Sequence, residues 1–210
     1  QRHLPRLASG AVVATLAVAE GPGRTEAAQL QARYTPDPGR LTGSLDGDKL
    51  PVPAAPEAHL ALVACSTATG AQHIAPATTL VLVDLAQPGV FTTALAHFDP
   101  FRTQGHITFT GAAAEPLAAV PAGVDPLDAV LDRAAVLTAF EQIGGADACL
   151  AMARAYALER RVFARPIGAF QAIKHRLADM AARIELARSN AWFAAWALEQ
   201  ADAGTPEAVD

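Results

Sequence analysis

The second half of the chain carries the pattern that most limits its fold. After Pro166, apolar residues recur at alternating steps of three and four, which places them along one stripe of a long helix. The stripe comprises Phe170, Ile173, Leu177, Met180, Ile184 and Ala187. Arg160 and Arg161 suit the C-terminal end of an earlier helix, and Pro166 suits the first turn of the next one. The sequence therefore predicts a hairpin of two long helices, from about residue 127 to 160 and from 166 to 198 or beyond, whose stripe requires partner helices.

The first half of the chain shows a different and shorter pattern. Brief apolar runs are separated by turns that carry Gly and Pro, as is typical of a β-sandwich or barrel. The predicted strands are 11–20, 29–34, 40–45, 59–65, 78–85, 91–97 and 106–110. Residues 111–126, rich in Ala, Pro and Gly, are predicted to connect the two halves. We therefore predict an α+β fold, with a β domain over 1–115 and a helical domain of the four-helix-bundle type over 116–210.

Composition narrows the classes of function. The net charge of −5 and the scattered basic residues argue against a nucleic-acid partner or an anionic membrane surface. No apolar stretch is long enough to span a bilayer. Cys65 and Cys149 lie far apart in the sequence, which favours reduced thiols and a cytoplasmic protein. His175 and Asp179 are four residues apart, but a metal site generally takes three or four ligands, so we predict no metal.

The start of the chain allows two interpretations. Arg2 and Arg6 precede an apolar run over 11–19, and its last residues resemble a signal-peptide cleavage site. The run is short, however, and Gly10 and Thr15 interrupt it. We interpret it as a strand that ends at Glu20.

The hairpin also carries a dense resemblance to a known family. Its order of residues resembles the helical-domain signature of the acyl-CoA dehydrogenases, in the residues Tyr156, Ala157, Arg160, Phe163, Pro166, Ile167, Phe170, Gln171 and 177–180. In that family the arginine, phenylalanine and glutamine of the signature reach the ADP half of the FAD in a neighbouring subunit. The resemblance thus implies cofactor-binding roles for Arg160, Phe163 and Gln171. Ala164 stands where the family usually has glycine.

Weaker matches extend over the rest of the chain. Leu4-Pro5 and the strand ending at Glu20 resemble the entry to the family's middle domain, and 41–49, 99–102 and 141–145 resemble further phrases. Gly144 and Gly145, inside the first predicted helix, suggest close approach of another backbone. Over 18–26 the chain lacks the threonine and serine with which typical members hydrogen-bond the flavin and its pyrophosphate. That departure implies that this chain's own middle domain binds FAD poorly.

The resemblance implies an FAD-dependent enzyme that removes hydrogen across the α,β-bond of a fatty or steroid acyl-CoA thioester, within a homo- or hetero-oligomer. The chain resembles subunits of actinobacterial heteromeric acyl-CoA dehydrogenases. The alternative is a non-catalytic subunit that completes a partner's FAD site. No catalytic base is assigned: Asp132 is the nearest carboxylate to one family position, and Glu141 belongs to a phrase that members with other bases share. Family members extend beyond both ends of this chain, so a fragment and a degenerate subunit are both open.

Overall fold

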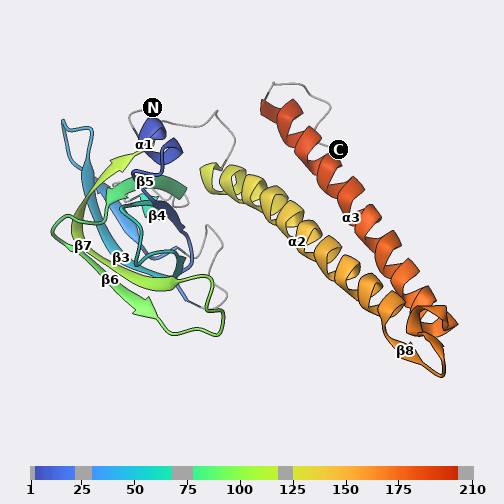
Figure 1. Cartoon of the computed structure of the whole chain (residues 1–210). Coiled ribbons are helices and arrows are strands. Elements are labelled where there is room, and N and C mark those ends of the chain that lie inside the picture. The colour runs from blue at the N-terminus through green and yellow to red at the C-terminus, as the bar shows by residue number, and fades with distance from the viewer. Residues whose placement is uncertain (1–2, 22–29, 68–77, 118–124, 203–210) are drawn as a thin grey trace. The chain divides into compact units, whose positions relative to one another are not determined.

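The computed structural model describes residues 3–21, 30–67, 78–117 and 125–202. The chain divides into two compact units, Gln1–Ala129 and Val130–Asp210. The first unit holds a short helix α1 (Leu4–Ala8) and all the strands of one sheet, and the second holds most of a helical hairpin (Figure 1). Each unit is described here by itself.

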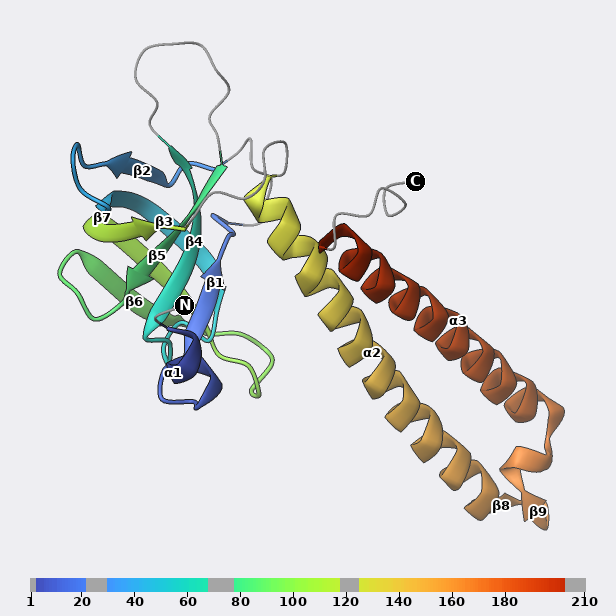
Figure 2. The ribbon, with the colours of Figure 1, turned by 90° about the horizontal axis from the view of Figure 1, so that it is seen from above.

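The strands of the first unit close into a barrel. They are β1 (Ala14–Ala17), β2 (Arg33–Pro36), β3 (Gly43–Pro53), β4 (Leu60–Thr67), β5 (Thr78–Asp84), β6 (Val90–Leu95) and β7 (Gln104–Pro116). Hydrogen bonds run in the order β4–β2–β3–β7–β5, and β5 pairs back onto β4, which closes the ring (Figure 2). β1 lies parallel to β4, and β6 pairs with β7 alone in the described sheet. The predicted barrel or sandwich is therefore a barrel.

Alternating side chains fill the barrel interior. On β4, β5 and β7 the inward positions are apolar, and each is almost completely withdrawn from water: Val63, Cys65, Val81, Val83, Ile107 and Phe109. Burying one such aliphatic or aromatic side chain stabilises the fold by about 1.5–3 kcal/mol. Because all the strands except β6 contribute buried residues to one shared interior, the barrel forms a core without help from the helices.

Several predicted strand boundaries were wrong. The strand predicted over 11–20 is only Ala14–Ala17, because residues 4–8 form α1 and Glu20 makes just an isolated bridge to Leu50. The strand predicted over 29–34 is displaced to Arg33–Pro36. β7 continues to Pro116, so the connection predicted from residue 111 begins too early. There Gly111 adopts a φ of +61°, which lets the strand bend and continue.

The strand predicted to end at Leu45 is also too short, since β3 runs unbroken for 11 residues. Gly47 has a φ of +132°, and the register of β3 against β7 shifts between Leu45 and Gly47. A Cβ on Gly47 would lie 2.7 Å from Ala32 Cα. The glycine therefore admits a close neighbouring backbone, and the extra residue of the β-bulge lies on β7, where Thr110 and Gly111 stand opposite Asp46.

The two long helices were predicted well in extent. Helix α2 (Pro126–Glu159) has 34 residues. It begins with Pro126, and Asp125 Oδ1 accepts a hydrogen bond of 2.8 Å from the Leu127 amide, as a helix-capping side chain does. Helix α3 (Gln171–Asp202) has 32 residues. The sequence predicted α3 to begin at Pro166, and that boundary is wrong.

The helices contact each other along one seam. Its buried residues are Ile143 on α2 with Ile184 and Ala191 on α3, and Arg188 reaches Asp147 across the seam at 2.6 Å. Of the predicted stripe, Ile173, Leu177 and Ile184 are buried or half-buried, whereas Met180 and Ala187 are exposed. Because only one seam is covered within this unit, much apolar surface of both helices remains exposed.

Candidate functional site at the tip of the hairpin

The connection between α2 and α3 is a small structured tip. Strands β8 (Arg161–Val162) and β9 (Arg165–Pro166) form a two-residue β-hairpin, and a 3-10 turn η2 (Ile167–Ala169) leads into α3. Pro166 lies in β9 with a ψ of 144°, which explains why it does not begin a helix. The Ile167 amide donates to the Arg160 carbonyl at 2.8 Å, so the two ends of the tip are tied together.

The turn of this hairpin is strained. Phe163 and Ala164 have φ values of +51° and +61°, the left-handed region in which a side chain costs roughly 1–2 kcal/mol. Arg161 stabilises the turn by donating from its guanidinium to the Ala164 carbonyl at 3.1 Å. Phe163 is 86% exposed. A bulky aromatic residue that is both strained and exposed is a reason to look for a ligand-binding role.

The three residues that the sequence assigned to a cofactor all lie in this tip. Arg160 follows the last residue of α2, Phe163 stands in the turn, and Gln171 begins α3. Within the part of the chain that the structure describes, the side chains of Arg160 and Gln171 form no ion pair or hydrogen bond. Their polar groups are thus available to a ligand.

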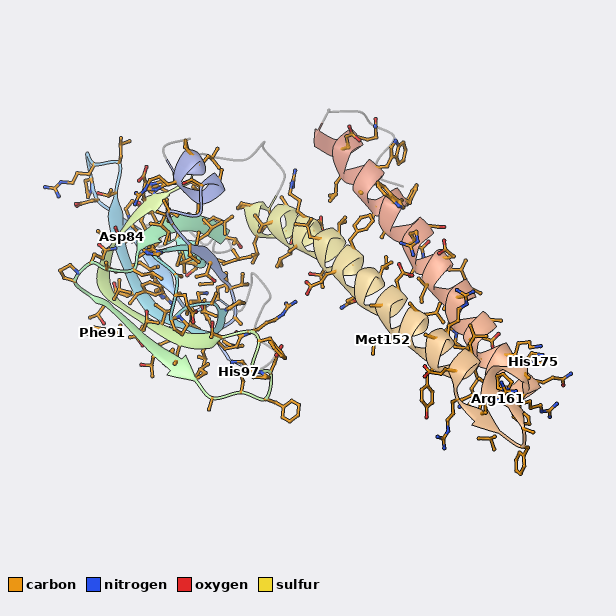
Figure 3. The ribbon with its side chains drawn as sticks, in the orientation of Figure 1. Asp84, Phe91, His97, Met152, Arg161 and His175 are labelled. Carbon is orange, nitrogen blue, oxygen red and sulfur yellow. The ribbon has the colours of Figure 1, made fainter. Side chains whose placement is uncertain are left out.

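The charge of the tip suits an anion. Residues 159–176 carry a net charge of +4, although the whole chain has −5. Figure 3 shows Arg161 and His175 together at the end of the hairpin where α2 gives way to α3. The guanidinium and amide donors fit a diphosphate, and the exposed ring fits a base. The residues present therefore fit the ADP half of a dinucleotide.

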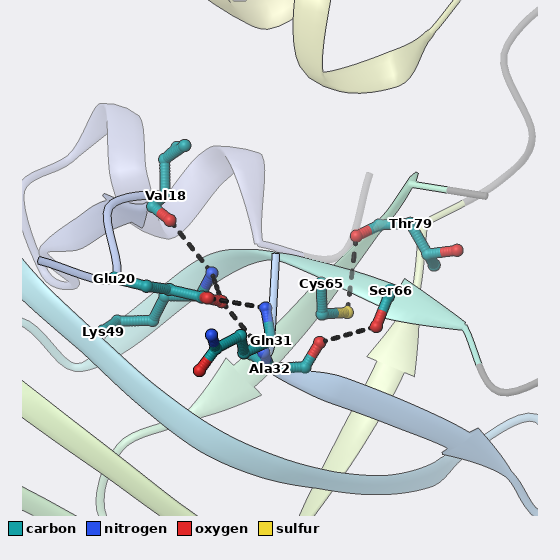
Figure 4. A network of polar contacts seen from close by, with 8 residues as sticks. All are labelled: Val18, Glu20, Gln31, Ala32, Lys49, Cys65, Ser66 and Thr79. Carbon is teal, nitrogen blue, oxygen red and sulfur yellow. Dashed lines mark hydrogen bonds and ion pairs between the residues drawn. The ribbon is translucent and has the colours of Figure 1, made fainter. Parts of the chain in front are cut away.

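A second polar cluster lies inside the barrel, and it was not predicted. Lys49 is fully buried on β3, and its ammonium donates to Glu20 Oε1 at 2.7 Å and to the Val18 carbonyl at 2.9 Å (Figure 4). The Glu20 carboxylate also accepts from the amides of Gln31 at 2.6 Å and Ala32 at 2.9 Å. The two Lys49 contacts join Val18 and Glu20 to β3, and the two amide contacts join Glu20 to Gln31 and Ala32.

Burial acts in opposite directions on the pKa values of Glu20 and Lys49. Desolvation would raise the pKa of Glu20, but the hydrogen bonds from Lys49, Ala32 and Gln31 and the Lys49 charge outweigh it and lower that pKa. Burial lowers the pKa of Lys49, and Glu20 opposes that effect. The short ammonium–carboxylate contact is that of an ion pair. Since both Glu20 oxygens are engaged, this carboxylate is a structural group.

The alternation of inward and outward positions along β3 could have located the buried lysine. Leu45 is inward-facing on β3, and counting alternate positions onward from it reaches Gly47 and then Lys49. The predicted strand ended at Leu45, so the inward position of Lys49 was not assigned. Of the stretch 18–26, in which the threonine and serine of the family are missing, residues 22–26 lie outside the described residues. Among the described residues nearest to them, 18–21, no side chain carries a hydroxyl.

The remaining candidates are dispersed along the helices. Asp132 and Glu141 are exposed on α2, and neither is given a catalytic role. In the described part of the chain, no atom lies within 4 Å of a Cβ built on Gly144 or Gly145. The close backbone approach predicted there is therefore not made by the described residues of the hairpin.

His175 and Asp179 are exposed, and no group of three or more His, Cys, Asp or Glu side chains among the described residues could hold a metal ion. None of the described helices is long and apolar enough to cross a membrane. Trp192 packs edge-on against Phe140, with ring centres 5.2 Å apart, as a packing residue does.

Comparison with known proteins shows which class this fold and tip resemble. Residues 122–209 match the model of the acyl-CoA dehydrogenase C-terminal domain. The chain is 50% identical over 64 residues to acyl-CoA dehydrogenase IpdE2 of Mycobacterium tuberculosis, which covers 30% of this chain and 20% of that protein. It is 35% identical over 169 residues to acyl-CoA dehydrogenase FadE27 of the same organism, covering 80% of this chain and 41% of that one.

A solved structure agrees over nearly the whole chain. A variant of the Tcur3481-Tcur3483 steroid ACAD superposes with a TM-score of 0.80 and 31% identity, over 95% of this chain and 51% of that one. The chain is thus similar to acyl-CoA dehydrogenases over both of its units, and residues 122–209 match the C-terminal domain of that family. It spans about half the length of that solved relative and 20% to 41% of the two curated ones.

Proposed function

We propose that this chain is part of an FAD-dependent acyl-CoA dehydrogenase and that its hairpin tip contacts the ADP half of an FAD held with a neighbouring subunit. The observation that carries the proposal is the strained, exposed Phe163 between Arg160 and Gln171, whose polar side chains have no bonded partner within the described chain. Strain of this kind persists where function requires it.

The reaction is the one implied by the similarity to acyl-CoA dehydrogenases. When bound, the flavin accepts a hydride from the β-carbon of an acyl-CoA thioester while a carboxylate removes the α-proton. This chain's residues would bind and orient the cofactor: Arg160 and Gln171 as donors to the diphosphate region and Phe163 as an apolar contact. We propose a fatty or steroid acyl chain, supported by the relatives named above. No described carboxylate is proposed as the base.

One observation favours a second function, that of a non-catalytic partner subunit. Near the barrel position where the family binds flavin, residues 18–21 carry no hydroxyl, and both Glu20 oxygens are occupied by Lys49 and backbone amides. Losing one buried hydrogen-bond donor to a ligand costs about 1–3 kcal/mol. In this version the chain supplies its tip to a partner's FAD and stabilises the oligomer, while the partner performs the chemistry.

The exposed surface of the hairpin supports assembly into an oligomer, whether the chain is catalytic or a non-catalytic partner subunit. Large apolar side chains are exposed along both helices: Leu137, Met152, Tyr156, Leu158, Leu186, Trp192 and Phe193. A bundle core needs about four helices, and this hairpin provides two. We therefore propose assembly with an acyl-CoA dehydrogenase subunit, either a second copy or a different chain. The free thiols of Cys65 and Cys149 support a reducing compartment, and we propose the cytoplasm.

The test is flavin retention and sedimentation of the assembled complex, with the parent compared with Arg160→Ala and Gln171→Ala. Both substitutions are compatible with helix, so the fold should persist. We expect each to weaken FAD retention while the sedimentation coefficient stays unchanged. Lys174→Ala, which removes an exposed charge on the next turn of α3, is the control. Variants that hold FAD as tightly as the parent would refute the role assigned to the tip.

A further inference from the structure

Three side chains from different parts of the tip contact one another. The Arg165 guanidinium, from β9, lies over the Phe170 ring with its carbon 4.1 Å from the ring centre. Phe163, from the turn, meets Phe170 with ring centres 6.5 Å apart and planes at 75°. Phe170 itself stands immediately before α3. The ring of Phe170 is therefore shared between a cation and a second aromatic ring.

This stack is the one defined contact of the Arg165 side chain in the described chain. Arg165 is exposed, and no hydrogen bond or ion pair of its guanidinium occurs among the described residues. An exposed cation–π contact changes an equilibrium by only about two- to fivefold. It can contribute little to holding two helices of more than thirty residues together, but it is enough to select one rotamer of an aromatic side chain.

We propose that Arg165 is a positioning residue: by stacking on Phe170 it fixes the Phe170–Phe163 pair, so that Phe163 presents its exposed ring to the purine of the ADP moiety. The inference rests on the proposed function of the tip. Phe163 needs such a support because it projects from a two-residue turn and is otherwise surrounded by solvent. Ordering the ring before binding lowers the entropy that the ligand must remove.

A direct role of Arg165 in binding phosphate makes a different prediction. A guanidinium that contacts the diphosphate would weaken every phosphate ligand when removed, with or without a base. A guanidinium that acts through the two rings would affect only a ligand that carries the purine. Comparison of ADP with inorganic pyrophosphate therefore separates the two roles.

The experiment is a titration of the assembled complex, freed of FAD, with ADP and with pyrophosphate, for the parent, Arg165→Met and Arg165→Lys. We expect Arg165→Met to weaken ADP binding about two- to fivefold more than it weakens pyrophosphate binding. Arg165→Lys retains a cation for the ring and should restore part of the loss. Arg176→Met, which removes a charge from the same end of α3 without a ring contact in the described chain, should change both affinities by the same factor.

A double-mutant cycle tests whether Arg165 acts through Phe170. In a Phe170→Leu background, or Phe170→Met if the leucine variant does not fold, Arg165→Met should cause no further loss of ADP affinity. Additive losses, or equal losses for ADP and pyrophosphate, would overturn the positioning role. A parent that binds ADP while Arg165→Met binds it equally well would overturn this inference and leave the proposed function standing. A parent that does not bind ADP would overturn both.

Discussion

The barrel and the hairpin bury their residues in opposite ways. In the barrel all the strands except β6 contribute buried residues to one interior, and even the charged Lys49 that enters it is neutralised by Glu20 and hydrogen-bonded to Val18. In the hairpin one seam around Ile143 and Ile184 is covered, while Met152, Leu186 and Trp192 lie exposed. The barrel's sequence is thus explained by contacts inside the described chain, whereas the hairpin's sequence points to contacts outside it.

Helix α2 shows this most clearly. Between residues 143 and 158 only Asp147 and Arg154 are charged, and the remaining positions are occupied by apolar residues, two glycines and Tyr156. A helix that is apolar on all sides is normally buried on all sides. Here α3 covers one side, and the side that contains Gly144 meets open space in the described chain. A partner that packs closely against the uncovered side of α2 would bury the apolar surface that α3 leaves exposed.

The largest expected contrast concerns the two cysteines, one in each region. Burial raises the pKa of Cys65 in the barrel from 9.0 to about 12, which lowers its thiolate fraction about a thousandfold. Cys149 on α2 is exposed. A thiol reagent at pH 8 should therefore modify Cys149 rapidly and Cys65 only on unfolding. Mass spectrometry of the labelled chain checks this, with Cys149→Ser as the control. Protection of Cys149 in a complex would map the partner onto α2.

Breaking the buried ion pair should be the largest stability effect. Lys49→Met leaves the Glu20 carboxylate buried without its partner, and we expect a loss of about 3–5 kcal/mol in the free energy of unfolding. Urea denaturation followed by circular dichroism measures it. Lys174, the other lysine of the chain, is exposed on α3. Lys174→Met should therefore change stability by less than about 0.5 kcal/mol.

Removing the Glu20 charge as well tests whether the loss of stability comes from the unpaired carboxylate. The double variant Glu20→Gln with Lys49→Met should recover part of the loss, because no uncompensated charge then remains in the barrel. If Lys49→Met were as harmless as Lys174→Met, the barrel would not depend on the pair, and its description as a self-contained unit would fail.

A pair of helix substitutions compares the covered and uncovered surfaces of the hairpin. Ile184 is 9% exposed and Leu186 is 67% exposed. Ile184→Ala should cost about 2–4 kcal/mol by leaving a cavity in the seam, while Leu186→Ala should stay within about 0.5 kcal/mol in a monomer. Unfolding measured across a range of protein concentrations checks both. A large cost for Leu186→Ala that grows with concentration would show that this face is covered in an oligomer.

The smallest expected effect is an increase in stability. Ala164→Gly relieves a left-handed residue in the tip and should stabilise the chain by about 0.5–1 kcal/mol after the loss of unfolded-state entropy is subtracted. Ala182→Gly, at an exposed position in the middle of α3, should instead destabilise it by about 1 kcal/mol. Thermal unfolding of both variants gives the signs. Destabilisation by Ala164→Gly would mean that the turn is not strained as described.

Sequence patterns were most informative where one local rule operates. The extent of α2 and the length of α3 beyond its first turn follow from helical periodicity, and the resemblance located Arg160, Phe163 and Gln171 in one tip. Their cofactor role stays a prediction. Patterns failed where contacts distant in sequence decide the conformation. The strand was predicted to end at Leu45 because the close approach of Gly47 to Ala32 cannot be read from the local pattern, and Lys49 was missed because its partner Glu20 lies 29 residues away.

The hairpin tip is proposed to contact a flavin that is shared between subunits. The most direct measurement is the visible flavin absorbance of the purified chain, alone and after co-expression with an acyl-CoA dehydrogenase subunit. We expect substantial bound FAD only in the assembled species, and its loss with Arg160→Ala. A chain that stays a flavin-free monomer under every pairing, or an assembled Arg160→Ala variant with the parent's full flavin content, would contradict the claim.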